Sequence, residues 1–401
     1  MQLFIAFKSD ILMVEHAGGH KPNNPLAPVI GLSFFAIASG FLMSLIPLSL
    51  SAFELDNELA SWLASVFYLG LLMGAFFIER IVAKIGHRYA FMAFLGLLIC
   101  SVAAQLILPK AQVWLLARFV AGIAVAGVFV VVESWLLMTD TAKGRAKRLG
   151  LYMTSLYGGS AVGQLAIDPF GTSGALPYLF VIGLLFLAML APLLIKSGQP
   201  QSQHSQKLQL TELKKLSRPA ILGCLVSGLV LGPIYGLMPV YIAAQTEQAP
   251  FTGTLMAVII LGGMLVQPLV SYLSTRMAKS LLMALFCLFG AMGVVGIMHA
   301  VHFNVLMASY FILGAASFAL YPIAITLACD ALPIEKIVSA TEIMLLSYSL
   351  GSVFGPLFAA NLFASANGIM LYLGGCLITT CIYMLIKSLK SISTDNTPVA
   401  G

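Results

Sequence analysis

Long uninterrupted runs of apolar residues limit most strongly what this chain can fold into. Twelve such runs follow one another along the 401 residues, separated by short polar or turn-forming pieces. A run of about 20 apolar residues suits a helix that crosses the hydrocarbon core of a bilayer, and it is too long for a β-strand. The sequence therefore predicts an all-α polytopic membrane protein with twelve transmembrane helices. The runs cover residues 27–50, 59–79, 89–108, 113–138, 149–169, 175–195, 219–244, 251–274, 280–301, 304–329, 338–363 and 367–387.

The composition excludes a water-soluble fold and several classes of function. Apolar residues make up 60% of the chain and charged residues 9%, whereas soluble proteins contain roughly 45–50% and about 25%. The 21 basic residues form no dense patch, so we expect no nucleic-acid partner. The six cysteines lie in apolar runs without metal-ligand spacing, so we expect no metal site and no cofactor. The chain has no phosphate-binding loop and no HExxH motif or Ser/His pair within a run, so we expect neither a primary pump nor an enzyme.

The basic residues predict how the chain is oriented. If the N-terminus is cytoplasmic, 19 of the 21 Lys and Arg residues fall on the cytoplasmic side of the predicted helices. Lys110 then lies outside, and Arg118 lies within a helix. Because cytoplasmic loops of membrane proteins are enriched in Lys and Arg, both termini are predicted to be cytoplasmic.

The first half of the chain is repeated in the second half at an offset of 192 residues. Of the 16 glycines between residues 27 and 196, seven fall on a glycine when the sequence is shifted by this offset. Gly70 falls on Gly262, for example, and Gly122 on Gly314. Parallel repeats with an even number of spans are typical of transporters in which one half moves against the other around a central site. A channel built from one chain is the alternative.

The repeat predicts how the chain is divided into domains. We expect a cytoplasmic N-terminal segment, a six-helix bundle, a cytoplasmic linker, a second six-helix bundle and a cytoplasmic tail. A single chain can then form both halves of a cavity, and we expect it to function as a monomer in the lipid bilayer. The corresponding ranges are 1–26, 27–196, 197–218, 219–387 and 388–401.

Several short motifs identify a family resemblance that covers nearly the whole chain. They are Arg-Phe-Val-Ala-Gly at 118–122, Val-Val-Val-Glu-Ser at 130–134, Tyr-Gly-Leu-Met-Pro at 235–239, Leu-Ser-Tyr at 346–348, Gly-Ser at 351–352 and Gly-Pro at 355–356. On these residues the chain resembles the major facilitator superfamily (MFS), and within it the bacterial YcaD-type branch. The resemblance implies a transporter of the bacterial inner membrane that works by alternating access.

The superfamily's signature in the loop between spans two and three is only partly present. Lys84, Gly86 and Arg88 fit the signature, but Ala83 stands at the place of its acidic residue. Glu79 lies one helical turn earlier and is a candidate replacement. The second copy of the loop, which contains Arg276, matches less well. We interpret these residues as a candidate cytoplasmic gate.

Two ionisable residues in the fourth span are the candidates for proton coupling. A charge in hydrocarbon costs about 2.5–3.5 kcal/mol on insertion scales, so intramembrane ionisable residues are functional candidates. Arg118 and Glu133 are 15 residues apart, which places them about 22 Å apart along one helix. The resemblance associates Arg118 with proton coupling, and a poorly solvated Glu133 can exchange a proton near neutral pH. The alternatives are an interhelical hydrogen-bond clamp for Arg118 and pairing of Glu133 with Arg145 or Arg148.

In the superfamily, spans one, four, seven and ten line the central cavity. Aromatic and amide side chains there suit an amphipathic or weakly charged solute. The alternative is that these side chains pack in the core or face lipid. The candidates are Phe34, Phe41, Trp135, Gln164, Tyr235, Gln267, Tyr310, Tyr321 and Tyr348. Small residues let helices approach closely, so we interpret Gly159, Gly163, Gly351 and Gly355 as helix-packing glycines.

The sequence as a whole predicts a secondary active transporter that moves a small organic solute and is coupled to protons. An uncoupled facilitator is the nearest alternative, and it predicts that Glu133→Gln leaves solute flux intact. A sensor with a transporter fold would bind a ligand without flux. The sequence decides neither the substrate nor the direction of transport.

Overall fold

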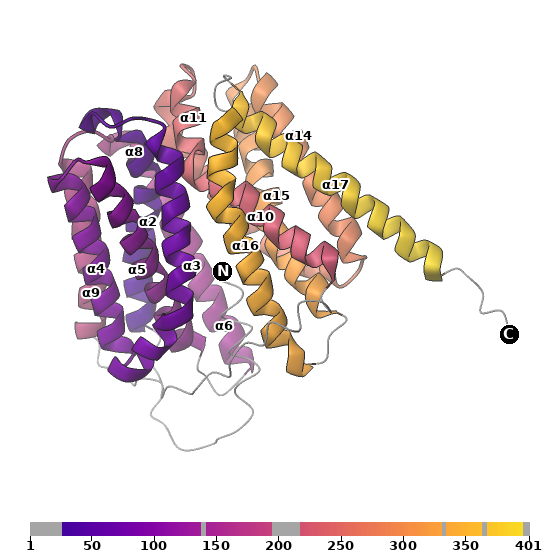
Figure 1. Cartoon of the computed structure of the whole chain (residues 1–401), viewed down its shortest axis with the longest axis horizontal. Helices are drawn as coiled ribbons and strands as arrows, with labels where there is room; N and C mark the ends of the chain where they lie inside the picture. The colour runs from indigo at the N-terminus through magenta and orange to yellow at the C-terminus, as the bar shows by residue number, and fades with distance from the viewer. Residues whose placement is uncertain (1–25, 138–141, 195–216, 331–333, 363–366, 396–401) are drawn as a thin grey trace. The chain divides into compact units, whose positions relative to one another are not determined.

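The computed structural model describes residues 26–137, 142–194, 217–330, 334–362 and 367–395 (Figure 1). Within these ranges the chain is helical and contains no β-strand. Eleven helices are long and apolar enough to cross a membrane. The prediction of an all-α polytopic membrane protein is confirmed. The segments 1–26 and 197–218 lie almost wholly outside the described residues.

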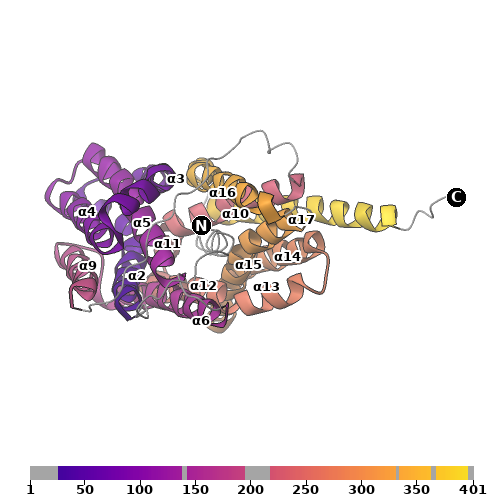
Figure 2. The ribbon, with the colours of Figure 1, turned by 90° about the horizontal axis from the view of Figure 1, so that it is seen from below.

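The first half of the chain supplies five continuous membrane-spanning helices. They follow the predicted runs closely, although α3 extends six residues beyond its predicted end at residue 79. Seen end-on in Figure 2, they lie together as one bundle. The helices are α2 (Leu26–Leu48), α3 (Leu59–Ile85), α4 (His87–Ile107), α5 (Ala111–Leu137) and α9 (Leu176–Leu194).

The predicted span 149–169 is helical but interrupted, and it is the one predicted span missing from the eleven candidate membrane helices of the described residues. It is divided among α6 (Ala142–Met153), a π-helical segment (Thr154–Gly158), α7 (Gly159–Leu165) and α8 (Ile167–Phe170). A π segment inserts an extra residue into the helix and changes the direction in which the following side chains point. Such segments occur frequently at functional sites.

The second half contains six spans, two of which are also divided. The seventh span breaks at Leu237, because Pro239 cannot donate the backbone hydrogen bond that would continue the helix. The eighth span breaks in the same way at Val266, before Pro268. The helices are α10 (Arg218–Gly236), α11 (Met238–Ala244), α12 (Thr252–Leu265), α13 (Gln267–Ser274), α14 (Lys279–His299), α15 (Phe303–Cys329), α16 (Ile334–Leu362) and α17 (Gly368–Asp395).

The chain forms two compact units. One contains residues 1–208 and 232–257, and the other contains residues 209–231 and 258–401. The start of α12 therefore packs with the first unit, and the rest of α12 with the second. The predicted bundle boundaries at 27–196 and 219–387 remain a prediction.

Glycine contacts repeat between the units at the same 192-residue offset as the sequence. A Cβ atom at Gly70 would overlap the carbonyl oxygen of Phe119, and a Cβ atom at Gly262 would overlap that of Phe311. The glycines of the partner helices, Gly122 and Gly314, make equally close contacts. A Cβ atom at Gly122 would meet the Phe67 oxygen, and one at Gly314 would meet the Ile259 oxygen. These glycines let α3 approach α5 and α12 approach α15 at backbone distance.

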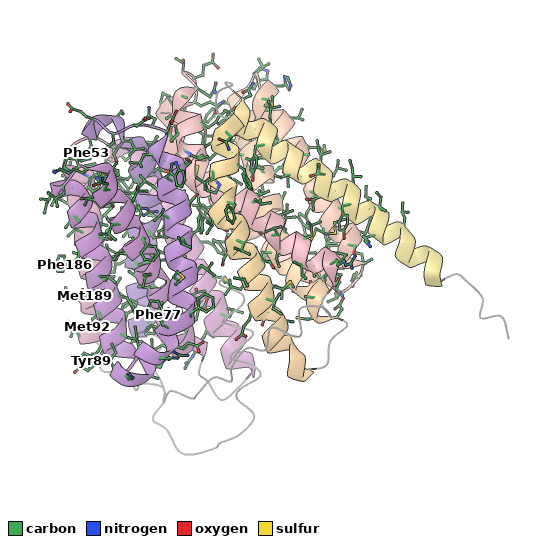
Figure 3. All side chains as sticks on the ribbon, viewed as in Figure 1. Phe53, Phe77, Tyr89, Met92, Phe186 and Met189 are labelled. Carbon is green, nitrogen blue, oxygen red and sulfur yellow. The ribbon has the colours of Figure 1, made fainter. Side chains whose placement is uncertain are left out.

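Large apolar side chains cover the outward face of the first unit. Figure 3 shows Tyr89 and Met92 of α4 near Phe186 and Met189 of α9 along one side of the bundle. Tyr89 is 66% exposed and Phe186 is 51% exposed. Exposing such a large apolar surface to water is unfavourable, whereas exposing it to the hydrocarbon of a bilayer is not. This face is the one that lipid covers.

Candidate functional site

Glu133 of α5 is buried inside the first unit, with a side chain that is 1% exposed. The phenol of Tyr152, from α6, donates a hydrogen bond of 2.7 Å to Glu133 Oε1. The other carboxylate oxygen, Oε2, has no hydrogen-bond partner. No cation forms an ion pair with Glu133 among the residues that the structure describes. Within the described residues, the carboxylate therefore has one hydrogen-bond partner, and that partner is neutral.

The bases considered as partners for Glu133 do not fill this role in the described structure. Arg148 donates a hydrogen bond to the carbonyl oxygen of Leu136 at 3.3 Å. The side chain of Arg145 lies outside the described residues. Tyr152, which makes the contact to Oε1, stands one residue before the end of α6. The π-helical segment begins two residues later.

Arg118 lies on the same helix as Glu133, toward its N-terminal end. Its guanidinium stands over the ring of Phe67 from α3, with the Cζ atom 4.3 Å from the ring centroid. Its electrostatic neighbours are the phenols of Tyr68 and Tyr178, from α3 and α9. The Nε atom has no hydrogen-bond partner. The structure therefore places the two proton-coupling candidates in separate environments, and they form no ion pair with each other.

Several of the predicted cavity residues are enclosed within their own bundles. Phe41 and Tyr310 are 0% exposed, and Trp135 is 2% exposed. The ring of Phe41 packs edge-on against Phe180 at 5.4 Å. Gln164 is also fully covered, and it joins α7 to α2 through two short hydrogen bonds. Its Oε1 accepts from Ser44 Oγ at 2.6 Å, and its Nε2 donates to the Gly40 oxygen at 2.6 Å.

The remaining cavity candidates differ in how far they are buried and in what they contact. Phe34, Tyr235 and Gln267 are half-buried. Gln267 Nε2 donates to the carbonyl oxygen of Gly263 at 3.1 Å. In the second unit, the rings of Tyr321 and Tyr348 lie 5.0 Å apart in an edge-on arrangement, which brings two candidates from α15 and α16 together. Whether any of these side chains contacts a substrate remains a prediction.

Three of the four helix-packing glycines stand at close helix crossings. A Cβ atom at Gly159 would meet the side chain of Ala36 in α2, and one at Gly163 would overlap the Ile37 oxygen. In the second unit a Cβ atom at Gly351 would overlap the Leu225 oxygen of α10. Gly355 is buried in α16. The contacts tie α2 to α7 and α10 to α16.

The gate candidates between spans two and three form a tight turn. Gly86 has φ +80° and ψ 157°, a conformation that is open to glycine and strained for other residues. Arg88 donates a hydrogen bond of 3.0 Å to the Leu193 oxygen, near the C-terminal end of α9, where a cation is favourable. Glu79 and Lys84 are exposed.

In the second copy of the loop, Arg276 stands over the Tyr272 ring, with its Cζ atom 4.4 Å from the centroid.

Three polar residues that the sequence analysis did not select make specific contacts. Tyr152 holds Glu133, as described above. His87 is buried, and its Nε2 lies 3.0 Å from Ser134 Oγ. Asp168 accepts hydrogen bonds from the backbone amides of Gly253 and Thr254 at 2.8 and 3.0 Å. Within the described residues, no group of three His, Cys, Asp or Glu side chains could hold a metal ion.

Comparison with known families decides the identity of the fold. The model of a family described as the Major Facilitator Superfamily matches residues 29–391. The chain belongs to the major facilitator superfamily. The resemblance inferred from its motifs is therefore confirmed.

The curated relatives of this MFS chain lie in the branch that its motifs indicated. An "Uncharacterized MFS-type transporter YcaD" of Salmonella typhi is 30% identical over 375 residues, which cover 92% of this chain and 96% of the relative. An "Uncharacterized MFS-type transporter Ent638_1421" of Enterobacter sp. (strain 638) is 30% identical over 379 residues, with the same coverage.

Two solved structures share the MFS fold with this chain. A mutant of the nucleoside transporter NupG superimposes with a TM-score of 0.77 at 11% identity, covering 90% of this chain and 99% of its own. A variant of the E. coli fucose:proton symporter FucP superimposes with a TM-score of 0.58 at 16% identity, covering 91% and 98%. At these identities the likeness concerns the fold alone.

Proposed function

We propose that this MFS protein is a proton-coupled secondary active transporter for a small organic solute, and that Glu133 carries the proton. It moves the solute across the bacterial inner membrane by alternating access of its two halves. Both termini lie in the cytoplasm, and a monomer is sufficient for function. It works without a cofactor and is not an enzyme.

The observation that carries the proposal is the environment of Glu133. A carboxylate removed from water is costly when it is ionised, and it is stabilised either by a cation or by a proton. Glu133 is 1% exposed and has one hydrogen-bond donor, the phenol of Tyr152. Because no described cation pairs with it, binding a proton is the way in which this site becomes neutral. Release of that proton requires water or another proton acceptor to reach the carboxyl group.

The geometry around Glu133 supports a coupled mechanism. Tyr152 stands two residues before the π-helical segment of the fifth span. A change in the charge of Glu133 alters the strength of its hydrogen bond to Tyr152, because charge-assisted hydrogen bonds are stronger than neutral ones. The fifth span is thereby linked to the protonation of the fourth. The names of FucP and NupG, a fucose:proton symporter and a nucleoside transporter, support transport of a small polar solute by this fold.

A reconstituted transport assay tests the proposal. Purified protein is placed in proteoliposomes that contain a pH-sensitive dye, and sugars, nucleosides, amino acids, organic acids and cationic dyes are added in turn. We expect a solute that drives proton movement in the wild type, and loss of this proton movement in Glu133→Gln. The matched control is Glu58→Gln, which removes an exposed carboxylate and leaves proton movement unchanged.

The alternative functions give different results in the same assay. Solute flux without proton movement in the wild type, or flux with unchanged proton movement in Glu133→Gln, contradicts the proposal and favours a facilitator or another proton carrier. Ligand binding without flux across the sealed bilayer favours a sensor.

A further inference from the structure

The second charged residue of α5, Arg118, is half-buried. Among the described residues, no carboxylate forms an ion pair with Arg118 and no group accepts a hydrogen bond from its Nε atom. Its contact is the ring of Phe67, 4.3 Å from Cζ. A cation–π contact stabilises the charge but accepts none of the five N–H donors of a guanidinium. Among the described residues, the guanidinium of Arg118 therefore has no negatively charged partner.

Glu133 cannot supply the missing charge. The two residues are 15 positions apart on one continuous helix, so their Cα atoms are separated by about 22 Å. Even extended side chains do not close that distance. The two charges of α5 therefore need two separate partners, an anion at Arg118 and a proton at Glu133.

The surroundings of Arg118 are aromatic. Trp114 lies one helical turn before Arg118, on the same side of α5. Its ring lies 5.5 Å from that of Phe53 and 6.4 Å from that of Tyr178. Figure 3 shows Phe53 near one end of the bundle. The phenol of Tyr178 is engaged with Ser49 Oγ at 2.8 Å. Trp114 and Tyr178 are fully covered, so the aromatic ring that stands open beside the cation is that of Phe67, which is half-buried. One fixed cation beside an apolar ring suits an organic anion with an apolar body.

We propose that Arg118 binds the carboxylate group of a small organic anion, and that this anion is the transported solute. A guanidinium and a carboxylate match in geometry, because two parallel N–H donors meet two oxygens. The charges match as well. One guanidinium neutralises a singly charged anion, and it does not neutralise a doubly charged phosphate.

The inference deepens the proposed function and rests on it for the transport step. One carboxylate on Arg118 and one proton on Glu133 move no net charge when they cross together. Symport of a monocarboxylate with one proton is then electroneutral. The binding step, however, depends on Arg118 alone and can be tested without any flux.

The three tryptophans of the chain provide a local probe for that binding step. They are Trp62, Trp114 and Trp135. The double variant Trp62→Phe/Trp135→Phe leaves Trp114, which is fully buried beside the Arg118 site, as the sole tryptophan. The fluorescence of this protein in detergent is titrated with butanoate, hexanoate and phenylacetate. The neutral amides of the same acids, inorganic phosphate and chloride are titrated in parallel.

We expect at least one carboxylate to change the Trp114 fluorescence saturably, with an apparent affinity about tenfold or more above that of its amide. Arg118→Met should abolish this preference. Arg118→Lys keeps the charge but not the two-pronged geometry, so it should weaken carboxylate binding severalfold while keeping the preference over the amide. Phe67→Leu keeps the guanidinium but removes the ring beneath it, so it should weaken binding while keeping the preference for the carboxylate over the amide. Gel filtration and far-UV circular dichroism show which variants are folded. If Arg118→Met is not folded, the two single variants Arg118→Lys and Phe67→Leu are sufficient for the test.

Several results would overturn the inference. Equal affinity for an amide and its acid, no response to any of the carboxylates, or an unchanged preference in Arg118→Met each contradicts it. An Arg118-dependent response to phosphate or chloride instead of carboxylates would show an inorganic anion site. If only the proposed function fails, the result differs from these. A carboxylate would then still bind at Arg118, but the proteoliposomes would show no proton movement. Glu133→Gln should leave the Trp114 titration intact.

Discussion

The phenol of Tyr152 donates a hydrogen bond of 2.7 Å to the buried carboxylate of Glu133 and so joins α6 to α5. The bond connects two spans at the point where the fifth changes from α-helix to π-helix. In the proposed mechanism, it is the contact through which protonation of Glu133 in the fourth span acts on the fifth span.

Replacing Tyr152 by Phe should therefore affect both stability and coupling. The ring is kept, but Glu133 Oε1 loses its donor, which costs about 1–3 kcal/mol for a buried group that is left unsatisfied. The lost bond stabilises the ionised carboxylate more than the neutral acid. The decrease in unfolding temperature in detergent should therefore be larger at alkaline than at mildly acidic pH. In the Glu133→Gln background the effect should shrink, because the two residues are coupled. Equal destabilisation at both pH values and in both backgrounds would contradict this.

The glycine crossing between α3 and α5 should be intolerant of even one added methyl group. A Cβ atom at Gly122 would overlap the Phe67 oxygen, which is backbone and cannot rotate away. Overpacking of this kind costs about 1–3 kcal/mol. Gly122→Ala should thus lower the unfolding temperature clearly. Gly183→Ala is the matched control, because nothing lies within 4 Å of a Cβ atom there, and it should be neutral or slightly stabilising.

The bonds between Asp168 and the start of α12 should stabilise the first unit. One carboxylate oxygen accepts from the Gly253 amide, and the other accepts from the amide and hydroxyl of Thr254 at 3.0 and 2.9 Å. A carboxylate that caps a helix N-terminus contributes about 0.5–2 kcal/mol. Asp168→Ala should lower the unfolding temperature more than Thr254→Val, which removes only the hydroxyl bond. The reverse order would show that the backbone contacts contribute little.

The turn at Gly86 should admit no other residue without strain. At φ +80° and ψ 157° a side chain costs about 1–3 kcal/mol. Gly86→Ala is expected to destabilise the junction of α3 and α4, which limited proteolysis and thermal unfolding would both detect. Exposed Lys84, two residues earlier in the last turn of α3, provides the control, since Lys84→Ala removes a charge without strain.

The spans and the repeat could be predicted from the sequence because lipid imposes both on the chain. Every backbone group in hydrocarbon must be bonded within its helix, so each span needs a long apolar run that is visible in the sequence. The 192-residue offset was visible because close crossings admit only glycine. The contacts of Gly70 with Phe119 and of Gly262 with Phe311 repeat that offset in space. The interruption of 149–169 was not predicted, because hydropathy does not distinguish α- from π-helical turns.

The candidate site could be predicted only in part. A glutamate within an apolar run, Glu133, was visible as an ionisable group in hydrocarbon. Its partner Tyr152 was not, since the pair depends on which sides of two helices face each other. The same holds for His87 with Ser134, and for Asp168 with Gly253, which are 47 and 85 residues apart. Uniformly apolar spans carry no amphipathic pattern that would indicate these faces.

The most direct test of the central claim is to observe the proton on Glu133 itself. Infrared difference spectra of the purified wild type and of Glu133→Gln are recorded as the pH is lowered from alkaline to mildly acidic values. Our account predicts that the carbonyl stretching band of a protonated carboxylic acid grows in the wild type and is missing in Glu133→Gln. In Tyr152→Phe the band should shift in frequency, because the phenol bonds to the carboxyl group. Identical spectra of the wild type and Glu133→Gln over the whole pH range in which both are folded would contradict the claim that Glu133 carries the proton.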